Sequence, residues 1–141
     1  MTMRIVLLTD EIELQQFWAD AKPLLEKCVI KAVHGEYNTE DVAKLIRDNR
    51  AIVFLTYIDG KPSVALAIEW VIYPRLKVAN VMALGGSQLM LNADSYWEKI
   101  KRVLKSAGMK YVQCSCSPAM ARMLSSKLGF EEMYREMRLK L

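Results

Sequence analysis

The sequence predicts one α/β domain in which helices pack on a mixed sheet, and three observations lead to this fold class. First, 52% of the 141 residues are apolar and the net charge is only +4, which excludes an intrinsically disordered chain. Second, segments with strand-like alternation and segments with helix-like periodicity follow one another along the chain. Third, no repeat, low-complexity tract or linker interrupts them, so residues 1–141 are expected to form a single domain.

The first third of the chain predicts a strand and two helices. Met3–Leu8 is a short apolar run typical of a strand. Asp10, followed three residues later by Glu13, has the capping pattern that begins a helix, and Asn38 can cap a second, short helix that ends near Asn49. The predicted buried face of the first helix comprises Leu14, Phe17, Trp18, Ala21, Leu25 and Cys28, and that of the second comprises Val42, Leu45 and Ile46.

The middle of the chain predicts three consecutive antiparallel strands. Ala51–Ile58 is rich in β-branched and aromatic residues, and Asp59-Gly60 is a strong two-residue hairpin signal that leads into Lys61–Tyr73. A further turn leads into the strand Val78–Leu84, which Gly85-Gly86 is expected to end.

The last third predicts two helices that alternate with two strands. Ser95 and Glu98 form a capping box, which predicts a helix over 95–107 that Gly108 closes. The strand Met109–Cys116 should then lie parallel to the strand before the helix, and ligands of such sheets favour the loop after the earlier strand, here Gly85–Asn92.

The final predicted helix begins at Ser117-Pro118 and ends at Gly129. From Phe130 onward apolar and polar residues alternate, which predicts a last, half-buried strand. The predicted order is therefore β-α-α-β-β-β-α-β-α-β.

This order, and the Leu-Gly-Phe sequence at the end of the segment Ser117–Phe130, resemble the GNAT superfamily of N-acetyltransferase-like acyltransferases. The family's closing helix ends in this signature, in which the glycine adopts the left-handed conformation that stops a helix. The resemblance covers the whole chain. It implies a GNAT-like mixed sheet with helices on both faces, and transfer of an acetyl group from acetyl-CoA to an amine.

The resemblance also implies where coenzyme A would bind. The strand backbone would pair with the pantetheine arm and the amides that follow would approach the phosphates, since backbone N–H groups at a helix N-terminus attract anions. The phosphate loop is degenerate here, because the glycines are spaced differently from the family's Arg/Gln-x-x-Gly-x-Gly/Ala pattern and Asp94 would repel a phosphate. The implied cofactor-binding residues are Met82, Ala83, Leu84, Gly85, Gly86 and Ser87.

Two residues are candidates for proton transfer. Ser125 occupies the position at which the family commonly has a tyrosine that protonates the leaving thiolate, and a serine hydroxyl is a poorer acid. Glu69 lies within an apolar strand, where burial would raise its pKa and suit it to act as a base, although an outward-facing surface carboxylate is the alternative. Asn80 stands where some members carry a carboxylate, and it cannot accept a proton.

The cysteines predict packing rather than a metal site. Cys114 and Cys116 share one face of a strand, but a zinc site would need two more ligands, and the remaining candidates, His34 and Cys28, are far away in sequence. We therefore expect no metal and two small core residues. A nucleophilic pair of Cys116 with His34 stays open on sequence grounds.

Charge and methionine content bear on the partners. Residues 99–141 carry ten Lys or Arg against three Asp or Glu, which suits a polyanion or a solvated basic face, while no motif indicates nucleic-acid binding. Nine methionines are typical in part of core filling and in part of an adaptable surface for a homo-oligomer or a protein partner, and the apolar run Leu89-Met90-Leu91 could either fold over an empty cofactor cleft or form such a contact surface. The absence of a signal peptide and of a sufficiently long apolar run predicts a cytoplasmic protein away from membranes.

Two classes of function follow from the sequence. The first is an acetyl-CoA-dependent N-acetyltransferase acting on a small-molecule or protein amine, in which positioning of a neutral amine supplies much of the catalysis. The second is a catalytically inactive GNAT-like binding or structural module, such as those found in bacteriophage particles.

Overall fold

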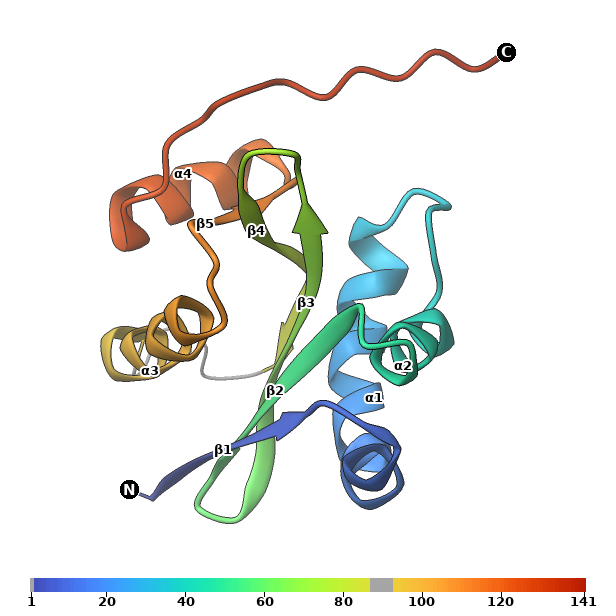
Figure 1. Ribbon diagram of the computed structural model, residues 1–141, viewed down its shortest axis with the longest axis vertical. Helices are drawn as coiled ribbons and strands as arrows, with labels where there is room; N and C mark the ends of the chain where they lie inside the picture. Colours follow the sequence, from blue (N-terminus) through green and yellow to red (C-terminus); the bar gives the residue numbers. More distant parts are fainter. Residues whose placement is uncertain (1, 87–92) are drawn as a thin grey trace.

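The computed structural model describes residues 2–86 and 93–141, with a five-stranded mixed sheet at its centre (Figure 1). The strand order is β1-β2-β3-β4-β5; all neighbours are antiparallel except β4 and β5, which are parallel. The strands are β1 (Met3–Leu8), β2 (Ala51–Ile58), β3 (Lys61–Ile72), β4 (Lys77–Gly86) and β5 (Tyr111–Cys114). The antiparallel strands and the parallel β4–β5 pair confirm the predicted topology up to the last helix.

Helices cover both faces of the sheet, as predicted. The helices α1 (Glu11–Ala32) and α2 (Thr39–Arg47) lie on one face, and α3 (Ala93–Ser106) and α4 (Pro118–Leu128) lie on the other side (Figure 1). Two apolar layers result, one between the sheet and α1 and α2, and one between the sheet and α3. The mixed α/β fold with helices on both faces is confirmed.

Most helix ends are set by the capping residues that the sequence indicated. The side chain of Asp10 accepts from the backbone N–H of Glu13 at 3.1 Å, and Asn38 and Asp41 form a reciprocal capping box. Ser117 caps α4, which ends at Gly129 with a φ of 75°. The predicted box at Ser95 is wrong, because α3 already begins at Ala93 and Ser95 lies inside the helix.

Strand β4 includes both glycines and ends at Gly86, two residues later than the sequence predicts. Gly85 and Gly86 continue the ladder with β3, opposite Ala65 and Val64. A Cβ atom at Gly85 would lie 2.0 Å from the backbone oxygen of Leu24 in α1, and one at Gly86 would lie 2.0 Å from that of Ser63. Both positions therefore require glycine because neighbouring backbone approaches too closely for any side chain.

The strand predicted over Met109–Cys116 is shorter in the structure, where β5 covers only Tyr111–Cys114. The neighbouring helix ends limit the strand on both sides. The N–H of Met109 donates to the Leu104 carbonyl at the end of α3, and Ser117 caps α4.

The last predicted strand, from Phe130 onward, does not form. Residues 131–141 are all exposed and have no strand partner among the described residues (Figure 1). Alternation favours a strand only where a neighbouring strand pairs with its backbone, and this segment has none. Across the ranges 2–86 and 93–141, no helix has the length and hydrophobicity needed to cross a membrane.

Replacing Gly85 by alanine is expected to lower the free energy of unfolding by about 3 kcal/mol or more, because α1 or β4 must move to admit the methyl group. Gly35→Ala is the matched control: its φ is +92° and nothing lies within 4 Å, so it should cost only about 1–2 kcal/mol of backbone strain. Urea unfolding of both variants measures the difference. Equal losses would show that the contact with Leu24 does not explain the glycine.

Candidate active site

Strand β4 runs on beyond its short pairing with β5, which leaves an opening on the β5 side of β4. Val78–Val81 is opposite Tyr111–Cys114, and beyond this point β4 continues to Gly86 with no partner on the β5 side among the described residues. The register between β3 and β4 also shifts here, because Ala67 is opposite Ala83 whereas Ile68 is opposite Val81. Met82 is thus the extra residue of a β-bulge, which lies directly after the last residue of β4 that pairs with β5.

A row of polar side chains crosses the sheet next to this bulge. Glu69 of β3 is opposite Asn80 of β4, which is opposite Gln113 of β5. All three side chains are half-buried, and Glu69 is also opposite Ala51, which packs in the layer below α1 and α2. Because residues that are opposite one another share a face, this polar row faces the side of α1 and α2.

Tyr37 connects the loop between α1 and α2 to the bulge. Its hydroxyl donates to the backbone carbonyl of Met82 at 2.6 Å. Burial, and to a smaller extent the nearby acidic groups of Cys28, Glu36 and Glu69, raise the pKa of Tyr37 to about 12. The neutral phenol is therefore held as a hydrogen-bond donor beside Met82, within electrostatic reach of the Glu69 carboxylate.

The loop that carries Tyr37 is held by hydrogen bonds at its exposed side. The N–H of His34 donates to Glu36 Oε2 at 2.7 Å. Arg138 donates to the carbonyl of His34 and to the carboxylate of Glu36, both at 2.9 Å. These contacts lie on the exposed side of the loop, whereas the Tyr37 side chain extends from the same loop to Met82.

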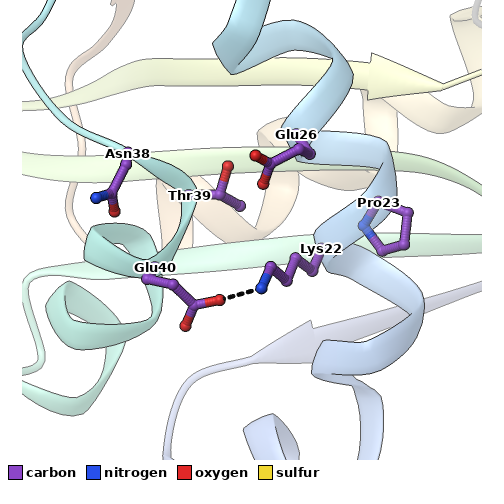
Figure 2. Close-up of a pocket in the computed structure, with 6 residues that line it drawn as sticks. All are labelled: Lys22, Pro23, Glu26, Asn38, Thr39 and Glu40. Atoms are coloured by element: carbon purple, nitrogen blue, oxygen red, sulfur yellow. Dashed lines mark ion pairs between the residues drawn. The ribbon is translucent and has the colours of Figure 1, made fainter.

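A separate hollow of about 390 Å³ lies between α1 and the start of α2 (Figure 2). The ion pair between Lys22 Nζ and Glu40, 2.5 Å long, crosses it. Its lining residues are Lys22, Pro23, Glu26, Asn38, Thr39 and Glu40. None of them comes from the sheet, so this hollow is distinct from the opening between β4 and β5.

The cysteines are placed differently from the sequence prediction. Cys114 is half-buried, and burial, together with the nearby Cys116, raises the pKa of its thiol to about 11. Cys116 is exposed beyond the end of β5, so the prediction that it is a core residue is wrong. In the described part of the chain, no group of three or more His, Cys, Asp or Glu is arranged to hold a metal ion.

The fold was compared with known proteins. No family model and no curated protein sequence matches the chain. Solved structures match it along its length. An aminoglycoside acetyltransferase from an uncultured soil metagenomic sample, in complex with sisomicin, has a TM-score of 0.71 and 17% identity, covering 99% of this chain and 96% of its own.

Two further structures show the same likeness. The ribosomal-protein-alanine N-acetyltransferase from Brucella melitensis biovar Abortus 2308 has a TM-score of 0.70 and 14% identity, with 99% of each chain covered. An acetyltransferase from Clostridium acetobutylicum with acetyl-CoA has a TM-score of 0.68 and 11% identity, covering 99% of this chain and 96% of its own.

The chain has the GNAT fold. The expected resemblance is therefore confirmed at the level of architecture. In this fold the pairing of β4 with β5 stops at Val81, next to the bulge at Met82.

The cofactor-binding residues implied by the GNAT resemblance occupy β4 and the segment after it. Met82 is half-buried and its carbonyl accepts from Tyr37, while Ala83 is buried below α1. Leu84 is half-buried toward α3. Gly85 and Gly86 lie inside the strand, and Ser87 is outside the described residues, as is the run Leu89-Met90-Leu91.

The two candidate proton-transfer residues lie on opposite sides of the sheet. Glu69 faces α1 and α2, whereas Ser125 is exposed on α4. Sequence reasoning missed Tyr37, because a tyrosine before a helix cap carries no signal that its hydroxyl reaches a strand 45 residues later.

Tyr37→Phe is expected to change how stability depends on pH. Below pH 10 the tyrosine is protonated in both states, so its stabilising contribution is constant; as pH rises from 10 to about 12 the unfolded chain ionises first, and wild-type stability falls. Over this range the free energy of unfolding of the wild type should fall by roughly 1–2 kcal/mol, after allowance for solvent screening of a half-buried group. The Tyr37→Phe variant lacks the phenol and should not show this fall. Urea unfolding on both sides of pH 10 measures it, with Tyr134→Phe in the exposed tail as control. Parallel pH profiles for wild type and Tyr37→Phe would contradict the role of burial.

Proposed function

We propose that this protein is an N-acetyltransferase that moves an acetyl group from acetyl-CoA to an amine. The observation that carries the proposal is the opening of the GNAT sheet at Met82, with half-buried Glu69, Asn80 and Gln113 beside it. A bound thioester would lie along open strand backbone next to a carboxylate and a neutral phenol. These are the groups that amide-bond formation between an amine and an acyl carbon can use.

The strand backbone at the opening fits the pantetheine arm. Among the described residues, 82–84 have no strand partner on the β5 side, so those of their amide and carbonyl groups that are bonded neither to β3 nor to Tyr37 can pair with an extended chain that carries amides of its own. Met82, Ala83 and Leu84 would hold the arm in this way. When bound, acetyl-CoA supplies the activated acyl group.

Other residues would contact the phosphates of coenzyme A. Gly85, Gly86 and Ser87 remain the proposed contacts, but the two glycines are already required by close packing against backbone oxygens. The basic residues of α3 and the following turn provide a positive field on the same half of the chain, where residues 99–141 carry ten Lys or Arg against three Asp or Glu.

The amine must lose a proton to attack the acyl carbon. We assign proton acceptance to Glu69, whose half-buried carboxylate lies on the face lined by Tyr37. The C–N bond forms as the C–S bond breaks, and the exposed Ser125 is proposed to relay a proton from solvent to the leaving thiolate, while Glu69 returns its proton to solvent. The Tyr37 hydroxyl fixes the Met82 carbonyl and with it the position of the bulge.

The acceptor is proposed to be a small-molecule or protein amine. A protonated amine approaching the polar row would meet the carboxylates of Glu69 and Glu36, which attract it before it is deprotonated. One structural neighbour is an aminoglycoside acetyltransferase in complex with sisomicin, and another is a ribosomal-protein-alanine N-acetyltransferase.

Acetyl-CoA is expected to raise the midpoint of thermal unfolding. A ligand present at 100 times its Kd stabilises the native state by about 2.7 kcal/mol. Titration with acetyl-CoA and with CoA, followed by circular dichroism, measures this, and ATP serves as the control for the basic surface alone. The absence of a shift at millimolar acetyl-CoA would reject the enzyme and leave the inactive binding module as the function.

Glu69→Gln is expected to lower kcat/KM by about 10²–10⁴-fold, with a smaller loss at high pH, because a neutral amine is then more abundant without the base. Acetyl transfer to a panel of amines, measured by thiol release, tests this. Glu26→Gln on α1 is the matched control, because Glu26 lines the separate hollow and should leave the rate unchanged. A Glu69→Gln variant with wild-type kcat/KM and pH profile would remove Glu69 from the mechanism.

A further inference from the structure

Two cysteine thiols lie near each other where β5 leads into α4 (Figure 1). Cys114 is the last residue of β5, and Cys116 follows two positions later, immediately before the residue that caps α4. Both are free thiols; Cys114 is half-buried and Cys116 is exposed. The Cys116 thiol is close enough to contribute to the raised pKa of Cys114. Cys116 is therefore the thiol that a reagent in solvent reaches first, with Cys114 beside it.

The third cysteine lies on the other face of the sheet. Cys28 packs in the layer between the sheet and α1. Cys114 is opposite Val81, which packs in the layer toward α3, so Cys114 lies on that face. The sheet thus separates Cys28 from Cys114 and leaves Cys116 as the thiol available to Cys114.

Backbone distances decide what a disulfide between these two residues requires. In an extended strand, residues two positions apart have Cα atoms roughly 6.6–6.8 Å apart, because each residue rises by about 3.3–3.4 Å. A disulfide usually joins Cα atoms about 5.5–6 Å apart, with an upper limit near roughly 6.8 Å. The chain must therefore bend at Ser115. This residue lies beyond the ladder with β4, and its side chain donates to the exposed Glu136 at 2.8 Å, a bond that water can replace.

We propose that Cys114 and Cys116 form a reversible disulfide with each other, and that closing it bends the chain between β5 and α4. Strained or exposed disulfides are the ones that small thiols reduce again most readily. The bend would draw Ser117 away from the position in which its side chain caps α4. It would also reach the edge of the opening in the sheet, because Cys114 is opposite Val81, the last residue of β4 that pairs with β5.

The oxidant in this proposal is the disulfide of a small thiol, for which glutathione disulfide is the probe. The Cys116 thiolate attacks one sulfur of glutathione disulfide, which forms a mixed disulfide and releases one glutathione that takes up a proton. Cys114 then gives its proton to solvent and attacks the Cys116 sulfur, so that the internal S–S bond forms and the second glutathione leaves and is protonated. Two protein thiols are oxidised, and one glutathione disulfide is reduced to two molecules of glutathione.

Counting thiols before and after oxidation tests the pairing. The reduced full-length protein, once denatured, should take up three N-ethylmaleimide groups, one on each cysteine. After treatment with glutathione disulfide it should take up a single group, on Cys28, in a monomer that lacks two hydrogen atoms and carries no glutathione by intact mass. Dithiothreitol should restore all three thiols.

Two variants separate the steps of the reaction. Cys28→Ala is the matched control and should form the same disulfide. Cys114→Ser should stop at the mixed disulfide of glutathione with Cys116, because the second thiol is missing. The pairing would be overturned by a treated wild type that keeps all its thiols, keeps glutathione on Cys116, pairs through Cys28 or links two copies. None of these measurements uses acetyl-CoA, so they test the disulfide independently of the proposed function.

Hydrogen exchange tests the bend. In the oxidised protein the amides of the first turn of α4 should exchange about fivefold faster than in the reduced protein, which corresponds to the loss of an N-cap. The amides of α2, whose cap at Asn38 is remote in sequence, should keep their rates. Cys116→Ser treated in the same way should exchange like the reduced protein. Unchanged rates in α4 of the oxidised wild type would overturn the bend.

Discussion

The close approach of helix α1 to strand β4 at Gly85 is the constraint on which the rest of the structure depends. The carbonyl of Leu24 occupies the space where any side chain at residue 85 would begin. The contact holds the middle of a 22-residue helix against the strand that has a partner on both sides. Position and direction of α1 then determine where the loop after it lies, and that loop carries Tyr37 to the carbonyl of Met82.

The same strand determines where the sheet opens. Strand β4 pairs with β3 along its length but with β5 only as far as Val81, and the bulge at Met82 separates the two parts. A bulge bends the strand and increases its local twist, and here it follows directly on the last residue that pairs with β5. The opening is thus a consequence of backbone geometry, and its chemistry comes from the side chains that happen to share the face: Glu69, Asn80 and Gln113.

Tight packing at Gly85 and Gly86 bears on how a GNAT fold can change its ligand contacts. These glycines look like remnants of a phosphate-binding loop in the sequence, yet the structure needs them where they are because of the backbone atoms of Leu24 and Ser63. A glycine kept for packing and one kept for anion binding cannot be told apart by residue type. The backbone of residues 82–84, which depends on no particular side chain, is therefore the more robust part of the proposed coenzyme A site.

The sequence by itself determined the order of elements, the Asp59-Gly60 hairpin, the caps at Asp10, Asn38 and Ser117, and the left-handed end of α4 at Gly129, because each depends on residues within one or two turns. Glu69 could be singled out in the same way, as a charge within an apolar strand. Only the tertiary structure decided that β4 includes its two glycines, that Tyr37 reaches Met82, and that the tail beyond Phe130 pairs with none of the described strands. Each of these outcomes depends on a contact with a segment that is distant in sequence. The residues around each position do not indicate which segment that is.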